Sequence, residues 1–420
     1  MEVFKFGGAS VRDAEAIKNV GKILEMTDHR PLAIVISAMG KTTNALEDII
    51  KTHYNQPQNL PPMVEKLKKY HEDIAQHLLP GDSQSLLNDL HDLWVELNWI
   101  LEEEPHPHYN YHYDQIIVFG EVASTKIVSA YLNNQQIKHQ WLDARSFIKT
   151  DSSYREARVN WESTQAAVES IIKPALEQQG MILTQGFIGS TPYNESTTLG
   201  REGSDYTAAI LAYALGADSV TIWKDVPGIM SADPKRFDHV SLLEEISYHE
   251  AIEMTYYGAK VIHPKTIKPL QNKEIPLYVR PFDKPAFFGT KISSSIDREL
   301  PPIIVVEPEQ VLFQISTRDF SFVAEEHISI LFDHIVSHSI KVNMMRNTAV
   351  SFMICIKNEP DKIDNLSNDL ERLFHVSMQE GLELITIRHA DDNILTELRK
   401  GKEILFEEEF GGTHRIVVKQ

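Results

Sequence analysis

Short apolar segments alternate with helical patterns through the first two thirds of this 420-residue chain, and this alternation limits the possible folds more than any other feature. Residues 32–36, for example, are apolar at every position, as expected of a strand that is buried on both faces of a sheet. Parallel strands need long crossover connections, and helices usually provide them. The pattern therefore predicts an α/β fold, a three-layer αβα sandwich with a mostly parallel central sheet.

The individual elements of this region can be placed from the same pattern. We expect strands at residues 3–6, 32–36, 115–119, 140–142, 181–185, 219–223 and 277–279. We expect helices at residues 13–26, 122–133, 162–178, 203–215 and 247–257, and through most of 42–104 with a break at 56–62.

The composition changes at residues 298–302, Arg-Glu-Leu-Pro-Pro, which we interpret as a linker. Beyond it the expected elements are a strand (311–317), a helix (322–338), two strands (341–346 and 349–357), a helix (361–374) and a strand (382–388). This βαββαβ order is typical of a small ferredoxin-like α+β unit. Residues 391–420 hold one short helix and two possible strands.

Charge and cysteine content exclude several classes of function. The formal net charge of −19 argues against a nucleic-acid partner, although one nucleotide needs only a local cluster of cations and N–H groups. The single cysteine, Cys355, excludes an internal disulfide and suits a reducing compartment. The apolar runs are shorter than a membrane span requires, and the chain starts directly into a strand pattern, so we expect a cytoplasmic protein without a secretory segment.

Ligands of parallel sheets collect where strands end and helices begin, because free N–H groups are available there. After the first strand, Gly7 and Gly8 would let the backbone approach a phosphate, and Lys5 could reach the same anion. Tight turns also use Gly-Gly, so this signal is weak alone. The Walker A and Gly-x-Gly-x-x-Gly motifs do not occur.

Two further loops are only suggestive. Residues 37–44 follow the second strand, and their hydroxyl groups could cap the next helix or contact a ligand. Glu121 follows Gly120 at the expected start of a helix, where the helix dipole favours a carboxylate in any case.

Residues 198–209, Thr-Leu-Gly-Arg-Glu-Gly-Ser-Asp-Tyr-Thr-Ala-Ala, form the most specific segment. Arg201, bracketed by two glycines before an Ala-rich helix, suits a bidentate grip on a carboxylate; the alternative is a capping turn with a surface arginine. Residues 222–229 and 232–236 combine a strand end, a Pro-Gly turn and a basic pair, which fits the edge of a nucleotide. Residues 258–264 place another lysine after a helix.

Taken together, these segments resemble aspartate kinases of the amino acid kinase superfamily. The matching residues occur in the family's order and at similar spacing: Lys5–Ser10, Ser37–Ala38, Thr43–Asn44, Thr184–Gly189, Thr198–Thr207, Ile222–Gly228 and Gly258–Pro264. The tail resembles the paired ACT domains that aspartate kinases carry. The resemblance implies a catalytic domain at 1–297 and an ACT-like region at 303–420, with a first unit at about 309–382 and an abbreviated second unit from about 303–308 and 383–420.

The implied reaction is the transfer of the ATP γ-phosphate to the side chain of L-aspartate, giving 4-phospho-L-aspartate, with Mg²⁺ on the phosphates. This is the first step of lysine, threonine and methionine biosynthesis. By resemblance, Lys5 with the Gly7 and Gly8 amides would stabilise the transferring group, and Asp205 would orient Lys5 and the metal–phosphate network. Arg201 would hold the aspartate α-carboxylate and Glu121 its ammonium group.

The other implied contacts concern the two substrates. The rest of the aspartate pocket would be Ser37, Thr43, Phe187, Glu202, Gly203 and Ser204. The nucleotide would lie near Lys5, Phe6, Gly7, Gly8, Lys224, Asp225, Met230, Lys235, Lys260 and Val261. No residue is expected to bind a metal ion directly. The nucleophile would be a carboxylate with a reference pKa of ~3.9, so the reaction needs no general base.

The shortened tail affects the expected regulation. Lysine-inhibited relatives have acidic residues where an approximate alignment places Asn343 and Ala349, so weak or absent inhibition by lysine is expected. ACT pairing implies a homodimer. The alternatives are a superfamily kinase acting on acetylglutamate, glutamate or a nucleotide, and a degenerate paralogue that serves as a regulatory subunit.

Overall fold

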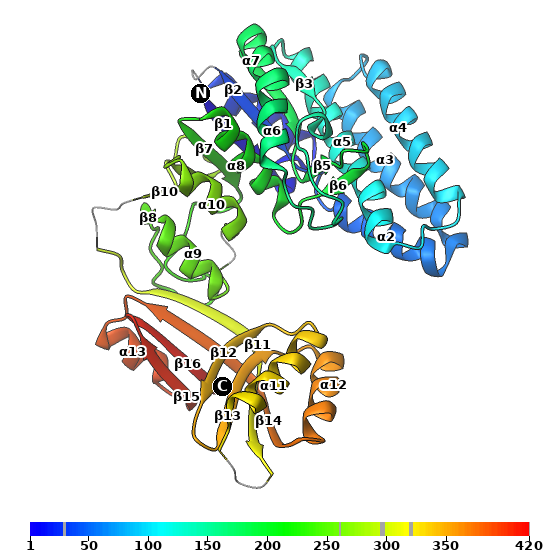
Figure 1. Cartoon of the computed structure of the whole chain (residues 1–420). Coiled ribbons are helices and arrows are strands. Elements are labelled where there is room, and N and C mark those ends of the chain that lie inside the picture. Colours follow the sequence, from blue (N-terminus) through cyan, green and yellow to red (C-terminus); the bar gives the residue numbers. More distant parts are fainter. Residues whose placement is uncertain (28–30, 260–261, 295–298, 319–321, 420) are drawn as a thin grey trace. The chain divides into compact units, whose positions relative to one another are not determined.

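The computed structural model describes residues 1–27, 31–259, 262–294, 299–318 and 322–419. The chain forms two compact units (Figure 1). The first comprises Met1–Ile229, Leu242–Ile252 and Lys260–Asp297, and the second comprises Met230–Ser241, Glu253–Ala259 and Arg298–Gln420. The second unit therefore takes two short segments from the part of the sequence that precedes the expected linker.

An eight-stranded sheet forms the centre of the first unit, in the order β3-β4-β2-β1-β7-β9-β10-β8. Every neighbouring pair is parallel except β9 with β10. Its strands are β1 (Glu2–Phe6), β2 (Leu32–Ile36), β3 (Gln140–Leu142), β4 (Met181–Gln185), β7 (Ser219–Lys224), β8 (Glu245–Ser247), β9 (Leu277–Pro281) and β10 (Thr290–Ser293). The predicted fold class, with a mostly parallel sheet, is confirmed.

The helices of this unit are α1 (Ala14–Glu25), α2 (Thr42–Asn55), α3 (Leu60–Leu78), α4 (Gln84–Glu102), α5 (Tyr109–Asn134), α6 (Trp161–Ala167), α7 (Lys173–Gln179), α8 (Gly203–Leu215) and α10 (Pro264–Asn272). A π turn (Val168–Ile172) joins α6 to α7, and α9 (Tyr248–Tyr256) has residues in both units. A hairpin of β5 (Ile188–Ser190) and β6 (Ser196–Thr198) lies between β4 and α8.

The predicted strand at residues 115–119 is wrong, because these residues are part of the 26-residue helix α5. Ile116, Ile117, Val118 and Phe119 are all buried. A helix that is buried almost all round lacks a polar face, so a short apolar run within it cannot be distinguished from a strand by periodicity. Glu121 consequently lies in the middle of a helix and not at a helix start.

Helices cover both faces of the sheet. Helix α8 packs on β1, β2 and β7, and α10 packs against α8. On the other side α1 and α5 pack together so closely that a Cβ atom on Gly21 would lie 3.1 Å from the Tyr131 ring. The carboxyl ends of the four central strands β4, β2, β1 and β7 therefore meet at one edge, between the two helical layers.

The second unit is built on a six-stranded antiparallel sheet in the order β12-β13-β11-β14-β16-β15. Its strands are β11 (Ile303–Thr317), β12 (Val342–Asn347), β13 (Ser351–Lys357), β14 (Phe374–Arg388), β15 (Glu403–Phe410) and β16 (Thr413–Lys419), and its helices are α11 (Glu325–Ser337), α12 (Pro360–Glu371) and α13 (Asp392–Arg399). The predicted βαββαβ order followed by one helix and two strands is confirmed.

The long strands β11 and β14 contribute to three apolar clusters, two of which lie under helices. One lies under α11 and α12 and includes Phe313, Leu331 and Leu366. The other lies under α13, and Ala232 of the 230–241 segment is part of it. That segment also accepts a 2.7 Å hydrogen bond at the Ser231 carbonyl from Ile304. The single helix of this half is therefore supplemented by a stretch of chain from before the expected linker.

None of the helices in the described residues combines the length and apolarity that a membrane crossing requires.

Candidate active site

The loops after β1, β2 and β4 are joined by backbone hydrogen bonds at one edge of the sheet. The Ser37 N–H donates to the Phe6 carbonyl at 3.1 Å, and the Gly186 N–H donates to the Ile36 carbonyl at 2.8 Å. The Gly40 N–H donates to the Gly8 carbonyl at 3.0 Å. Three loops that are far apart in the sequence thus form one continuous surface.

A buried carboxylate between two lysines lies at this edge. Lys5 Nζ is 2.6 Å from Asp205 Oδ1, and Lys224 Nζ is 3.6 Å from Asp205 Oδ2. Lys5 is 8% exposed and Asp205 is 2% exposed. Burial alone would raise the pKa of Asp205, but the charges and hydrogen bonds of Lys5 and Lys224 more than offset it, so the pKa is lowered.

The position of Asp205 follows from its place in the first turn of α8, where the helix dipole favours a negative charge. Lys5 and Lys224 come from β1 and β7, which are neighbours in the sheet. Two positive charges therefore share one anion. Lys5 also lies where the glycine loop (Gly7 and Gly8) begins, so a cation is next to the backbone amides of this loop, which suits the binding of an anionic ligand.

Gly8 is required by the close approach of two loops. A Cβ atom at this position would lie 2.8 Å from the Ala38 carbonyl oxygen and 3.1 Å from the Gly40 carbonyl oxygen. Because both contacts are to backbone, a side chain could be accepted only by moving the loop after β2. The neighbouring Gly7 passes directly by Lys5, with its Cβ position 3.3 Å from Nζ. Backbone amides and the lysine are thus adjacent, as phosphate binding requires.

Glu121 extends from α5 toward the loop after β2 and is 3% exposed. Burial raises its pKa to about 8, although a hydrogen bond with the backbone of Ala38 and the charge of Lys5 act in the opposite direction. Its Oε2 atom is buried and has no hydrogen-bond partner among the residues that the structure describes. A buried carboxylate oxygen without a partner is costly, and an incoming cationic group would satisfy it.

The loop that carries Arg201 is held by close packing against the loop after β4. A Cβ atom on Gly203 would lie 2.5 Å from the ring of Phe187, and one on Gly186 would lie 2.4 Å from Ser204 Cβ. The guanidinium group of Arg201 itself is exposed. Because the backbone of this loop is closely packed and the Arg201 side chain is accessible, Arg201 is suited to bind an anion from solvent.

Glu202 and Asp114 stabilise the same loop. Glu202 adopts a left-handed conformation (φ +54°), and its Oε2 accepts a 2.9 Å hydrogen bond from the His263 N–H. Asp114 of α5 accepts hydrogen bonds from the Thr198 hydroxyl group at 2.7 Å and from the Thr198 N–H at 2.9 Å. Sequence reasoning missed Asp114, since only its burial within α5 distinguishes it from a surface acid.

The structure brings most of the predicted residues to this edge. Gly7, Gly8, Ser37 and Phe187 lie in the loops just described, and Lys5 and Lys224 lie in β1 and β7. Gly203, Ser204 and Asp205 are in the first turn of α8, Glu121 is in the middle of α5, and Thr43 is half-buried in the first turn of α2. The Phe6 side chain is different, because it is fully buried and stacks on Trp223 with ring centroids 6.1 Å apart. Only the backbone of Phe6 is available to a ligand.

The structure does not test the remaining predicted nucleotide contacts. Asp225 is exposed just after β7. Met230 and Lys235 belong to the second unit. Lys260 and Val261 lie outside the described residues. The predicted roles of these residues remain predictions.

Comparison with known proteins relates the whole arrangement to one group of enzymes. The model of the Amino acid kinase family matches residues 1–281. Lysine-sensitive aspartokinase 3 of Escherichia coli (strain K12) is 28% identical over 399 residues, which cover 92% of this chain and 86% of that protein. Aspartokinase 2, chloroplastic, of Arabidopsis thaliana is 29% identical, with 92% and 73% covered.

Some longer relatives align with this chain over only part of their own length. Bifunctional aspartokinase/homoserine dehydrogenase 2, chloroplastic, of Arabidopsis thaliana is 32% identical over 66% of this chain, which spans 31% of that protein. Among solved structures, E. coli aspartokinase III in complex with aspartate and ADP superposes with a TM-score of 0.83 at 26% identity, covering 100% of this chain and 96% of that one.

The raised pKa of Glu121 predicts the effect of Glu121→Gln on stability. The folded chain keeps a proton on Glu121 that the unfolded chain releases, so the stability contribution is complete below the unfolded pKa of 4.5 and is lost as pH rises toward about 8. Glutamine does not titrate, so its contribution to stability does not change with pH. Since one pKa unit corresponds to about 1.4 kcal/mol, the variant should gain several kcal/mol over the wild type between pH 5 and 8.

Urea denaturation followed by circular dichroism across this pH range measures the difference. Glu65→Gln, which changes an exposed acid on α3, is the matched control and should run parallel to the wild type. If the free energy of unfolding of Glu121→Gln also changes with pH in the same way as that of the wild type, the pKa of Glu121 is not raised.

Proposed function

This chain belongs to the amino acid kinase family, and from that premise we propose that it is an aspartate kinase. The reaction is the transfer of the ATP γ-phosphoryl group to the side-chain carboxylate of L-aspartate, giving 4-phospho-L-aspartate. Two relatives named aspartokinase align with 92% of the chain, and a solved relative with a TM-score of 0.83 binds aspartate and ADP. The observation that carries the proposal is a pair of lysines on a buried Asp205 at the edge where Glu121 Oε2 has no hydrogen-bond partner among the described residues.

In this proposal the aspartate substrate is held by two opposite charges. Glu121 takes the ammonium group, which gives its buried Oε2 the partner that it lacks among the described residues. Arg201 takes the α-carboxylate, for which a planar guanidinium group is suited. Ser37, Thr43, Phe187, Glu202, Gly203 and Ser204 shape the remainder of the pocket.

The chemistry is positioning and charge neutralisation. The aspartate side chain is ionised at neutral pH, so it attacks phosphorus without a general base. Lys5 and the amides of Gly7 and Gly8 donate to the transferring phosphoryl oxygens, where negative charge must be stabilised. Asp205 holds Lys5 in place by its 2.6 Å ion pair, and Lys224 adds a second positive charge on the nucleotide side.

The site fits Mg²⁺-ATP if the nucleotide phosphates, and not a protein side chain, are the main ligands of the metal ion. Asp205 is already paired with two lysines, so it suits an indirect role toward a metal ion better than that of a ligand in its own right. Mg²⁺ would then be held mainly by the nucleotide phosphates, whose charge it neutralises. Besides Lys5, Gly7 and Gly8, the nucleotide contacts proposed from the sequence are Phe6, Lys224, Asp225, Met230 and Lys235, with Lys260 and Val261 in the part of the chain that is not described.

We place the catalytic domain at 1–297 and an ACT-like regulatory region at 303–420, with its first unit at about 309–382 and the second made of about 303–308 and 383–420. The antiparallel sheet with α11 and α12 on the first half and α13 on the second supports this division. A homodimer through this region, cytoplasmic location and a role at the start of lysine, threonine and methionine biosynthesis belong to the same proposal.

A hydroxylamine trap for acyl phosphates tests the proposed reaction. With ATP and Mg²⁺, the chain should form hydroxamate from L-aspartate and not from L-glutamate or N-acetylglutamate, and UMP should not raise ADP release. Lys5→Met should lower kcat by roughly 10²–10³-fold, the range for removing one preorganised donor to developing charge. Lys138→Ala, an exposed cation elsewhere in the first unit, should leave kcat unchanged.

Activity of the wild type on another of these substrates in place of aspartate would assign the chain to a different kinase of the family. Failure on all of them, with the fold intact, would favour a regulatory paralogue without activity.

Aspartate binding should release a proton near neutral pH. The pKa of about 8 keeps Glu121 mostly protonated at pH 7, and an ammonium group beside it stabilises the ionised form. Calorimetric titration with aspartate in buffers of different ionisation enthalpy should therefore give release of up to about one proton per aspartate bound. Glu121→Gln should abolish this release and weaken binding. Identical binding enthalpies in all buffers for the wild type would contradict the assignment of Glu121 to the ammonium group.

Lysine should inhibit the reaction weakly or not at all. The Asn343 amide donates to Gln310 Oε1 at 2.9 Å, and Ala349 is exposed, so neither offers a counter-charge for an amine. Asn343→Asp should increase sensitivity to lysine, whereas Asn347→Asp, an exposed position on the same strand, should not. Inhibition of the wild type by micromolar lysine in the hydroxamate assay would contradict this expectation.

A further inference from the structure

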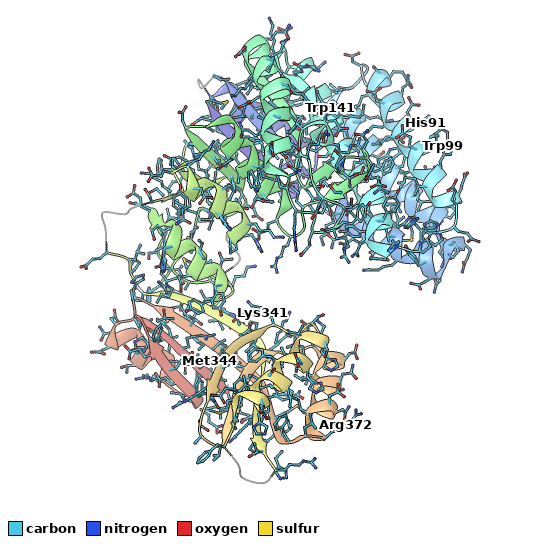
Figure 2. The ribbon with its side chains drawn as sticks, viewed as in Figure 1. His91, Trp99, Trp141, Lys341, Met344 and Arg372 are labelled. Carbon is cyan, nitrogen blue, oxygen red and sulfur yellow. The ribbon has the colours of Figure 1, made fainter. Side chains whose placement is uncertain are left out.

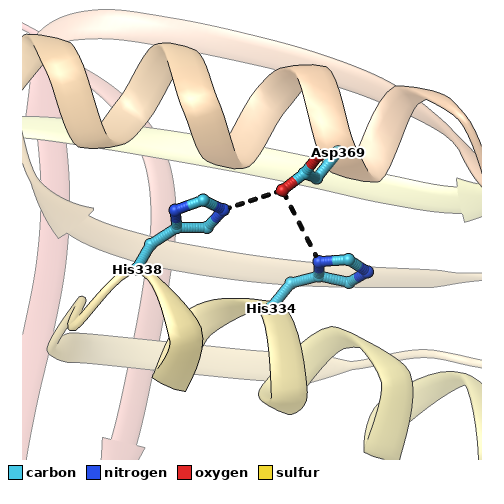
Figure 3. A group of neighbouring side chains, drawn as sticks. All are labelled: His334, His338 and Asp369. Atoms are coloured by element: carbon cyan, nitrogen blue, oxygen red, sulfur yellow. Dashed lines mark hydrogen bonds and ion pairs between the residues drawn. The ribbon is translucent and has the colours of Figure 1, made fainter.

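We propose that His334, His338 and Asp369 form a binding site for a divalent transition-metal ion, with Zn²⁺ the best-suited ion, that joins helix α11 to helix α12 in the second unit (Figure 3). The sequence analysis expected no residue that binds a metal ion directly. This site is separate from the candidate active site, because none of its three residues belongs to the first unit.

The two histidines lie one helical turn apart. His334 lies in the last turn of α11, and His338, four residues further on, is the C-cap residue of that helix, so the two side chains lie on the same side of the helix end. Asp369 extends from α12 toward that side (Figure 3). His338 Nε2 is 2.9 Å from Asp369 Oδ2, and His334 Nδ1 is 3.8 Å from the same oxygen. All three potential ligand atoms lie within 4.8 Å of one another.

These separations fit a tetrahedral ion. Zn²⁺ binds nitrogen and oxygen ligands at about 2.0–2.2 Å, which places neighbouring ligand atoms about 3.3–3.6 Å apart. The two distances to Asp369 Oδ2, 2.9 Å and 3.8 Å, lie on either side of this range, so small side-chain rotations would bring the atoms around one ion. Two imidazoles and a carboxylate suit Zn²⁺, whereas Mg²⁺ prefers oxygen ligands alone. A water molecule or a further ligand would complete the coordination.

The apolar core holds the two helices in register. Leu331 and Ile335 of α11 pack in the same buried cluster as Ile363, Leu366 and Leu370 of α12. The helix spacing is therefore set by the core and does not depend on the polar cluster. The three ligand side chains retain 21–30% exposure, which leaves them accessible to an ion from solvent.

A hydrogen-bonded cluster of these three side chains without a metal ion explains less of their geometry than a metal site does. The 2.9 Å contact accounts for His338, but at 3.8 Å His334 is too far from Asp369 for a hydrogen bond. Arg372 contacts the other oxygen, Asp369 Oδ1, at 3.4 Å, which leaves Oδ2 to the histidines. The Arg372 side chain is 76% exposed (Figure 2) and can move away from an incoming cation. Within the described part of the chain, no other group of three histidine, cysteine or acidic side chains is as close.

Calorimetric titration of the intact, tag-free chain with ZnCl₂, in a buffer that does not bind metal and without nucleotide, tests the site. One Zn²⁺ should bind per chain, and the same site should not take up Mg²⁺. His334→Ala should weaken Zn²⁺ binding at least about tenfold. This variant removes no hydrogen bond to Asp369, so its fold should be preserved. Asp369→Asn, which keeps the side-chain size, should weaken binding similarly.

His375→Ala is the matched control, since His375 is exposed in the same unit and outside the cluster. Its Zn²⁺ affinity should equal that of the wild type. Thermal denaturation gives an independent readout: Zn²⁺ should raise the unfolding midpoint of the wild type and of His375→Ala, but not that of His334→Ala or Asp369→Asn. Equal Zn²⁺ affinity in the wild type, His334→Ala and Asp369→Asn, or no binding to the wild type, would overturn the proposal.

Discussion

The candidate site depends on the ion pairs of Asp205. A carboxylate that is 2% exposed would be strongly destabilising alone, and it is tolerated because Lys5 and Lys224 neutralise it at 2.6 Å and 3.6 Å. These contacts connect α8 to two adjacent parallel strands at their carboxyl ends. The same contacts that make the buried charge acceptable thus also fix two cations at the start of the glycine loop, where a phosphate can bind.

Glu121 is also a buried acid, but unlike Asp205 it is not neutralised by a direct ion pair with a lysine among the described residues. It has one oxygen without a partner in the described structure and a pKa raised to about 8, so its environment is incomplete. The two lysines keep Asp205 charged, whereas in the proposed function Glu121 would become charged when the ammonium group of the substrate binds beside it. Two acids of similar burial therefore have different proposed tasks, one in keeping the catalytic cations in place and the other in recognising an amino acid.

Much of the fold could be predicted from the sequence. The apolar strands and the βαββαβ order of the tail were correct, since periodicity and turn residues are local signals. The predicted strand at 115–119 failed because α5 is buried almost all round, which removes the polar face that identifies a helix. In the site, Lys5 and Gly8 were identified from the loop after the first strand, and Asp205 was identified from the resemblance to aspartate kinases. Asp114 was missed because nothing in its neighbourhood along the chain distinguishes it.

The sequence by itself determined the type of sheet, the glycine loop and the spacing of His334 and His338. Each of these features depends on residues that are close together in the sequence. Only the tertiary structure decided that Asp205 lies between Lys5 and Lys224, and that Asp369 faces the two histidines. The reason is physical: burial and charge pairing are properties of side chains that meet in space, and these partners are separated in the sequence by between 19 and 200 residues.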